Sequence, residues 1–335
     1  MTASRLLERL FQTLPVLLGV SLIVFLMITL TPGDPVEIML ADSRATPEQA
    51  AVLRHDLGLD RPLPERFLIF LGRALTGDFG ISFFHRRPVW DVLVERLPAT
   101  IELTLAAILL ALAVAIPLGV AAAVKRDTWM DRALSAISLF GVSLPGFWFG
   151  ILLILLFAVQ WGIFPVGGRT SFDLEVARIT GFLLIDTLLA GRLDAFGAAL
   201  RHLALPAITL GLPTAALLAR VVRSAMAEVL TSDYVLFAEA KGLSRGRVLL
   251  RHALKNALIP VVTVAAIETG SLLGGNMIVE TVFGWPGLGR LVVESIFARN
   301  YPLVQAAVLF YAVTYVVLNF VADLLYTGLN PKVRL

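Results

Sequence analysis

Few side chains in this 335-residue sequence could carry out catalysis or hold a metal ion. Cysteine is absent, which excludes disulfides, thiolate metal sites and a cysteine nucleophile. The histidines His55, His85, His202 and His252 lie far apart, and none belongs to an HExxH or other paired-ligand motif. No glycine is followed by lysine, so the chain has no Walker-type phosphate loop. We therefore expect no metal centre, no cofactor and no ATP site in this chain.

One carboxylate stands out because of its apolar surroundings. Glu268 lies eleven residues beyond Ala257 in an apolar run over residues 257–279, which is about 16 Å along a helix. This depth is near the middle of a hydrocarbon core of ~30 Å, where an ionisable group is costly and is a functional candidate. We expect Glu268, with Asn276 nearer the outer end, to line a translocation pathway. The alternative is a glutamate buried against another helix.

A charged stretch precedes that run. Residues 225–241 have apolar side chains at helical spacing, Gly242 stands where a helix would end, and Ser244 could cap a second helix. In the second helix Arg247, Arg251 and Lys255 form one basic stripe, and Leu250, Leu254 and Leu258 form another face. Basic residues here could bind anionic lipid. A jointed pair of helices, however, favours a docking surface for another protein.

The elements that must position these groups are membrane spans. The chain is 58% hydrophobic and 16% charged, whereas soluble domains have about 45–50% and about 25%. Six apolar runs are long enough, or nearly so, to cross a bilayer: residues 11–30, 103–124, 133–161, 203–219, 257–279 and 301–322. The first has no cleavage site after it, which predicts a retained span. Residues 179–190, which contain Asp186, are too short and favour an interfacial or re-entrant segment.

The distribution of Lys and Arg predicts the orientation. With six spans and the N-terminus inside, the inner segments hold 14 basic residues in 63, and the outer segments hold 14 in 130. The positive-inside rule therefore places both termini in the cytoplasm. Residues 31–100 would lie outside, with a short helix that has Thr46 as N-cap, Pro47 in its first position and Gly58 at its end.

The sequence resembles the dipeptide/oligopeptide/nickel group of ABC importer permeases, which are inner membrane components of binding-protein-dependent transport. The resemblance rests on "DYVLFAEAKGLS", "RHALKNALIPVVT", "VETVFGWPGLG", "ATPEQAAVLRHDLG" and "GDFGISF". It implies an all-α polytopic fold of the type I ABC importer with six transmembrane helices and an external helical segment. The segments would be residues 1–32 with the first span, 33–98 outside, 99–327 as core with a coupling loop at 226–256, and a cytoplasmic tail at 328–335.

The resemblance also implies a role for the charged stretch, as a loop that docks onto an ATPase subunit. The positions that match the family's motif are Asp233, Tyr234, Ala238, Ala240, Lys241, Gly242, Leu243 and Ser244. The general Glu-Ala-Ala signature of such permeases falls on Leu236, Phe237 and Ala238, so only its last alanine and Gly242 are kept. The chain therefore follows the pattern of the peptide group and has no signature glutamate.

The resemblance implies an importer in the bacterial inner membrane, in which this chain is not an enzyme and ATP is hydrolysed by other subunits. Its partners would be a second, homologous permease, two ATPase subunits that bind ATP and Mg²⁺, an external solute-binding protein and the lipid bilayer, with no nucleic acid. Peptides are the default cargo, while nickel, glutathione or another small solute stay open, as does a partner permease that is a copy of this chain. A self-sufficient secondary transporter is the other alternative, but it predicts an inverted repeat, which we do not see.

Overall fold

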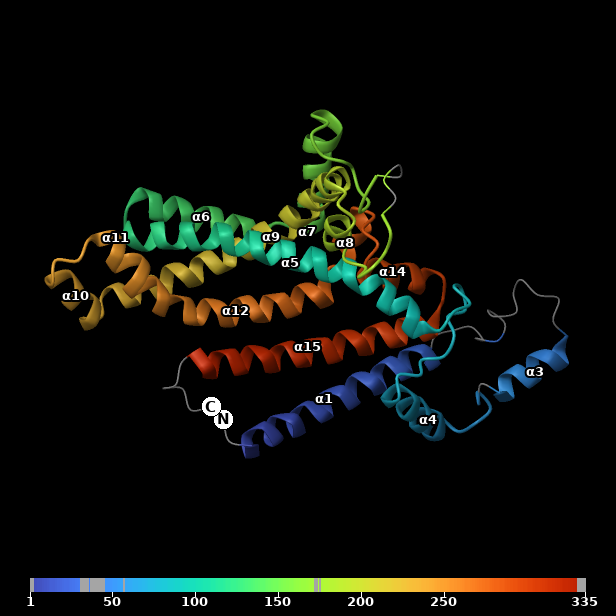
Figure 1. The fold of residues 1–335 in the computed structure, drawn as a ribbon. Coiled ribbons are helices and arrows are strands. Elements are labelled where there is room, and N and C mark those ends of the chain that lie inside the picture. Colours follow the sequence, from blue (N-terminus) through green and yellow to red (C-terminus); the bar gives the residue numbers. More distant parts are fainter. Residues whose placement is uncertain are drawn as a thin grey trace.

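The protein is mainly helical in the part that the computed structural model describes, which is residues 3–30, 36, 46–56, 58–171, 174 and 176–329. No β-strand occurs in these residues, and an isolated bridge joins Ile81 to Pro88. The long helices run roughly along one direction and form an elongated bundle (Figure 1). α1 begins, and α15 ends, at the same end of the bundle as α10 and α11, while α3 and α4 lie at the other end.

Four helical stretches in the described residues are long and apolar enough to cross a membrane. They are Val89–Val124, Leu193–Leu230, Arg245–Gly274 and Tyr301–Ala322, which belong to α5 (Val89–Val124), α9 (Leu193–Leu230), α11 to α12 and α15 (Tyr301–Leu329). Two shorter apolar stretches, Thr13–Met27 in α1 (Ala3–Leu30) and Gly146–Gln160, correspond to the first and third predicted spans. The structure thus supports a polytopic helical protein, and the count of six spans stays a prediction.

The third predicted span is broken in two, which the apolar run over residues 133–161 does not reveal. α6 (Trp129–Ser143) ends before Leu144, and the chain continues through Pro145 into α7 (Gly146–Leu153) and the π-helix η1 (Ile154–Gln160). The cause is local, because the ring of Pro145 pushes the preceding residue out of the helical region. Leu144 accordingly has an extended backbone, with φ −78° and ψ 130°.

The described residues between the third predicted span and α9 contain one short helix, α8 (Leu183–Leu189). It has seven residues, which is about 10 Å and too short to cross a bilayer. Asp186 accepts hydrogen bonds from the backbone amides of Ile179, Thr180 and Gly181 at 3.3, 2.8 and 3.0 Å, and so fixes the turn that leads into α8.

The first helices after α1 follow local rules. α3 (Pro47–Asp56) begins with a capping box, in which the Thr46 amide donates to Gln49 Oε1 at 3.0 Å and the Gln49 amide to Thr46 Oγ1 at 3.4 Å. Gly58 follows with φ +67°, so this predicted helix is confirmed. α4 (Leu63–Leu75) comes next and packs its Phe67 and Phe70 rings on Phe25 of α1.

The bundle is held together mainly by α5 and α9, which pack closely over much of their length. Gly119 and Gly211 permit this approach, since a β-carbon on Gly119 would lie 2.5 Å from Val222 Cβ, and one on Gly211 would lie 2.5 Å from Leu110 Cδ2. α12 (Leu254–Gly275) packs against α9, α5 and α15, and α1 lies beside α15 (Figure 1). α14 (Leu288–Phe297) packs against the beginnings of α5 and α15, and Met277 of α13 (Met277–Val282) packs on the same apolar cluster.

Candidate functional site

The charged stretch folds as a compact unit, which we call the jointed-helix unit and define as residues 231–256. α9 continues to Leu230, so the helix predicted over residues 225–241 is wrong in its bounds, and α10 (Asp233–Ala240) begins only after a turn at Thr231 and Ser232. α11 (Arg245–Arg247) and the π-helix η2 (Val248–Ala253) then lead directly into α12. The unit lies at the end of the bundle where α1 begins and α15 ends (Figure 1).

The joint between α10 and α11 is a Schellman turn. The Gly242 amide donates to Glu239 O at 2.8 Å, and the Leu243 amide donates to Ala238 O at 3.4 Å. Gly242 has φ +76°, a backbone conformation that glycine adopts at little cost. The glycine predicted to end the helix therefore does so. Ser244 stands at the N-cap of α11 as predicted, but its side chain makes no capping bond.

Burial divides the predicted ATPase-coupling residues into two groups. Ala238 is 6% exposed and belongs to the core with Val235. The structure therefore gives Ala238 a packing position, and Leu243 is half-buried against the same core. The remaining six predicted residues are exposed and could meet a partner: Asp233, Tyr234, Ala240, Lys241, Gly242 and Ser244. The Tyr234 hydroxyl also accepts a hydrogen bond from Asn256 Nδ2 at 2.7 Å, which ties α10 to α12.

Large apolar side chains that the motif did not single out complete this surface. Leu236 and Phe237 on α10 are exposed, and Leu250 on η2 is 68% exposed. Leu254 and Leu258, which the sequence placed on one face with Leu250, pack against the core. The π-helical turn of η2 explains the difference, because its wider i→i+5 repeat shifts residues from the faces that α-helical spacing predicts. Lys241 Nζ lies 4.5 Å from the centre of the Phe237 ring. Arg247, Arg251 and Lys255 are exposed, as the basic stripe predicts.

The two predicted pathway residues occupy different surroundings. Glu268 is half-buried in α12, and its carboxylate makes no hydrogen bond or ion pair with any residue that the structure describes. Asn276 is 2% exposed at the break between α12 and α13, and its Nδ2 donates to Thr104 Oγ1 of α5 at 3.3 Å. The geometry leaves Glu268 available to a ligand or partner, whereas Asn276 joins two helices of this chain.

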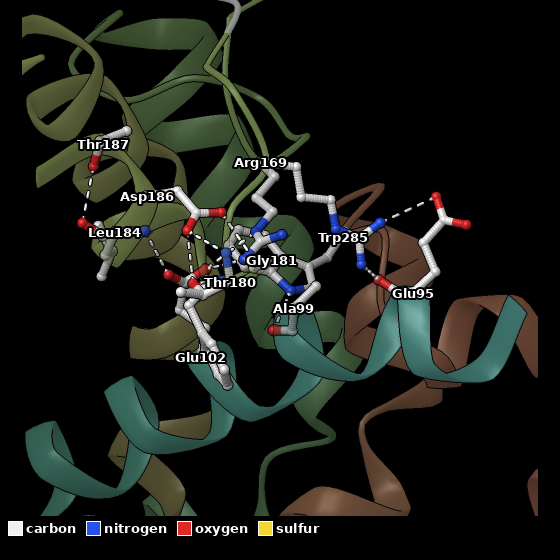
Figure 2. Close-up of polar contacts among 12 residues, drawn as sticks. Glu95, Ala99, Glu102, Arg169, Thr180, Gly181, Leu184, Asp186, Thr187 and Trp285 are labelled. Atoms are coloured by element: carbon white, nitrogen blue, oxygen red, sulfur yellow. Dashed lines mark hydrogen bonds and ion pairs between the residues drawn. The ribbon is translucent and has the colours of Figure 1, made fainter. Parts of the chain in front are cut away.

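A cluster of polar contacts ties the segment after η1 to the first half of α5 (Figure 2). The Arg169 guanidinium donates to Glu102 Oε2 from Nη2 at 2.6 Å and from Nε at 3.1 Å. The other oxygen of Glu102 accepts the Leu184 amide at 2.8 Å. The Arg169 guanidinium also donates a hydrogen bond to Gly181 O, and its Cζ lies 6.0 Å from the centre of the Trp285 ring. One guanidinium thus joins α5, the turn before α8 and the segment after α13.

Glu280 anchors the neighbouring turn between α13 and α14. It is 0% exposed, accepts the Thr100 hydroxyl at 2.7 Å and accepts the Arg290 amide at 3.0 Å. Gly287 packs on this carboxylate so closely that a β-carbon there would overlap the Glu280 oxygens. Trp285 Nε1 donates to Ala99 O at 2.8 Å. Residues 284–289 are therefore held against α5 by buried polar contacts.

Comparison with known proteins identifies the family. Residues 115–335 match the "Binding-protein-dependent transport system inner membrane component" family, and residues 3–104 match its N-terminal part. The chain belongs to this family of transport permeases. The permease is similar to the di/tripeptide transport system permease DppB of Pseudomonas aeruginosa, with 46% identity over 98% of this chain and 97% of that protein.

Two further relatives extend this picture. The dipeptide transport system permease DppB of Escherichia coli K12 is 44% identical, and the glutathione transport system permease GsiC of Salmonella choleraesuis is 39% identical. Each comparison covers 98% of the permease and 98% of the relative. A solved structure of the MetNI methionine ABC transporter, in an inward-facing form, has a similar fold, with a TM-score of 0.52 and 19% identity over 71% of this chain and 96% of that chain.

The sequence alone did not reveal several residues that organise the permease. Arg169 and Glu102 are 67 positions apart, and nothing local marks them as partners. Arg223 Nη2 lies 2.7 Å from Asp131 Oδ2, and this pair joins α9 to α6 although the two residues are 92 positions apart. The sequence signal that could have found them is a charged residue close to an apolar run, since such a charge needs a counter-charge or several hydrogen bonds when it is buried.

Proposed function

We propose that this permease is a pore-forming subunit of an ATP-binding-cassette importer, and that it translocates di- and oligopeptides delivered by an external solute-binding protein. The observation that carries this proposal is the jointed-helix unit. It presents exposed apolar side chains next to exposed basic ones on a rigid turn that the core anchors. Such a surface fits a groove on a partner better than it fits lipid alone, because its apolar part stands on α10, outside the predicted spans.

The energy for transport comes from partner subunits that contact the jointed-helix unit. The sequence has no phosphate loop, so ATP and Mg²⁺ are bound by two separate ATPase subunits. The surface that contacts them consists of Asp233, Tyr234, Ala240, Lys241, Gly242 and Ser244, with Leu236, Phe237 and Leu250 as apolar contacts. Closure of the ATPases moves this unit as a rigid body, and α11, η2 and α12 carry the movement into the bundle as one continuous helix.

The placement in the membrane completes the proposal. The permease crosses the bacterial inner membrane six times, with both termini and residues 226–256 in the cytoplasm and residues 33–98 outside. α1 and the broken helix α6–α7–η1 supply the two spans beyond the four long ones. A second, homologous permease completes the pore, and Glu268 of α12 faces the pathway between the two subunits, where it meets the ammonium group of a passing peptide. Residues 99–327 form the core of this arrangement.

Peptides are the proposed cargo because the relatives named as di/tripeptide and dipeptide permeases match along nearly the whole chain. Glutathione is the second candidate, favoured by the 39% identical glutathione permease. Glutathione is itself a short peptide with free carboxylates, so the two cargoes make similar demands on a pathway. Nickel has no such observation in its favour.

The test is uptake by the complete complex in vesicles. The permease, its partner permease, both ATPases and the binding protein are reconstituted, and accumulation of labelled dipeptide, tripeptide and glutathione is measured with and without ATP. We expect ATP-dependent accumulation of di- or tripeptide that requires the binding protein. Uptake by the permease without ATPase subunits, driven by an ion gradient, would instead support a secondary transporter.

A further inference from the structure

An open pocket of about 600 Å³ lies beside the first three turns of α9, and its described lining includes neither Glu268 nor any residue of the jointed-helix unit. One side is formed by residues 162–165 and Ser171, which follow η1. The other side is the α9 surface that carries Leu193, Asp194, Gly197, Arg201 and His202. Gly197, which has no side chain, and Ala198 also line the pocket between Asp194 and Arg201.

The walls of the pocket are held by hydrogen bonds. His202 is 9% exposed, its Nδ1 lies 2.9 Å from Gly167 O, and its Nε2 lies 3.4 Å from Ser171 Oγ. The Gly168 amide donates to Phe283 O of the α13 end at 2.8 Å, and the Ile163 amide donates to Phe157 O of η1 at 2.9 Å. The segment over residues 162–171 is therefore fixed to α9, α13 and η1, and these contacts hold the two sides of the pocket in place.

Among the described residues that line the pocket, the uncompensated charge is positive. Asp194 is paired with Arg192, with contacts of 2.7 to 3.2 Å between the guanidinium and the carboxylate, so its charge is compensated. Arg201 is exposed, and its guanidinium makes no hydrogen bond or ion pair within the part of the chain that the structure describes. An arginine in this state can bind a carboxylate in a bidentate manner. Ile163, Phe164 and Leu193 add apolar surface beside it.

We propose that this pocket receives an acidic side chain of the external solute-binding protein, with Arg201 as the group that binds the carboxylate. The inference rests on the proposed function, which places the beginning of α9 on the outer side. The openness of the pocket favours a protruding protein loop over a free peptide, because sites for small molecules enclose most of the ligand surface. A positive pocket also steers an acidic partner toward the membrane and speeds its association.

The experiment measures binding of the cognate solute-binding protein to the reconstituted complex, at low and high ionic strength. For Arg201→Gln we expect affinity to fall about threefold or more, mainly through slower association and with a weaker dependence on salt. Arg201→Glu should weaken binding further, by about tenfold or more, since it places like charges together. Arg201→Lys should keep most of the affinity. Arg73→Gln, which removes an exposed arginine of α4, is the matched control and should bind as the wild type does.

A second measurement separates the binding protein from its cargo. Uptake of dipeptides with a free and with an amidated C-terminus is compared in the wild type and in Arg201→Gln. If the preference for the free carboxylate is lost while affinity for the binding protein is unchanged, the pocket takes the peptide itself and the docking proposal is wrong. If affinity and preference both stay unchanged, the pocket has no role in recognition. If the wild-type complex does not bind the binding protein at all, the proposed function fails, whatever Arg201 does.

Discussion

Arg169 and Glu102 form a largely buried ion pair, with Arg169 Nη2 2.6 Å from Glu102 Oε2, that fastens the segment after η1 to α5. Their side chains are 17% and 7% exposed. Removing one member of such a pair leaves the other charge without a partner in a poorly hydrated place. This pair therefore holds Arg169, Gly181 and Leu184 against the first half of α5 (Figure 2).

Glu102→Ala should loosen this segment and cost about 3 kcal/mol of local stability. The Leu184 amide would lose its carboxylate acceptor, so its hydrogen exchange should become faster by about two orders of magnitude. Exchange measured in detergent tests this. The double variant with Arg169→Ala should be more stable than the sum of the single changes predicts. Simple additivity would show that the ion pair contributes nothing.

Gly242→Val should insert into the membrane but uncouple ATP hydrolysis from transport. A β-carbon at Gly242 meets no atom within 4 Å, so the strain comes from φ +76° alone and is about 1–2 kcal/mol. The bulkier side chain would also keep a docked ATPase away from the turn. Uptake in vesicles and ATPase activity with loaded binding protein measure the effect.

Gly246→Val is the matched control for that change. Gly246 lies in α11 with equally open space around its α-carbon, but it has no positive φ. Valine has a higher helix propensity than glycine, so we expect no loss of stability from this change and an effect of less than about 1 kcal/mol. Co-purification of the ATPases with Gly242→Val would locate the fault in transmission, and its absence would locate it in docking. Full coupled uptake by Gly242→Val would leave Gly242 as an ordinary helix end.

Glu268→Ala should change transport while the complex still assembles, because no described residue depends on the Glu268 carboxylate for a hydrogen bond. The expected change is lower uptake or a shifted preference among peptides with and without a free amino terminus. Glu268→Gln keeps the size of the side chain and removes the charge, so it separates electrostatics from shape. Uptake kinetics and preference equal to those of the wild type in both variants would make Glu268 a packing residue.

The orientation in the membrane can be tested with single cysteines, since the chain has none of its own. Thr76→Cys is exposed after α4 and should react with an impermeant reagent in intact spheroplasts. Thr231→Cys is exposed in the jointed-helix unit and should react only after the inner membrane is permeabilised. Ser82 lies near Thr76 but is 0% exposed and accepts a hydrogen bond from Asn300 Nδ2, so it is a poor labelling position. The reverse labelling pattern would invert the topology.

Asp131 pairs with Arg223 at the other end of the bundle, and this pair should be insensitive to pH in the usual range. Hydrogen bonds from Arg223 lower the pKa of Asp131 from 3.8 to about 2. A lowered pKa means that the pair contributes its full stability above pH 3.8 and loses it as the pH falls toward 2. Asp131→Asn should therefore lower stability by about 2 kcal/mol, equally at pH 5 and pH 8. A difference that changes between these values would contradict the pairing.

The sequence determined what depends on neighbours along the chain. The capping box of Thr46 and Gln49 and the turn at Gly242 follow from side chains and backbone sterics within a few residues. Apolar runs of about 20 residues predicted the long helices, because a bilayer leaves a backbone no other way to satisfy its hydrogen bonds. The break at Pro145 was also local, yet hydropathy alone hides it, since the helices on both sides of it are apolar.

Tertiary structure decided what depends on residues far apart in the chain. It buried Ala238 in the core while leaving Leu236 and Phe237 exposed, although all three lie on one short helix. It joined Glu102 to Arg169 and Asp131 to Arg223, and it placed Ser171 beside His202 to form a pocket. The sequence shows which polar and charged side chains will need a hydrogen-bond or ion-pair partner when they are buried. Only the packing of the helices determines which residue that partner is.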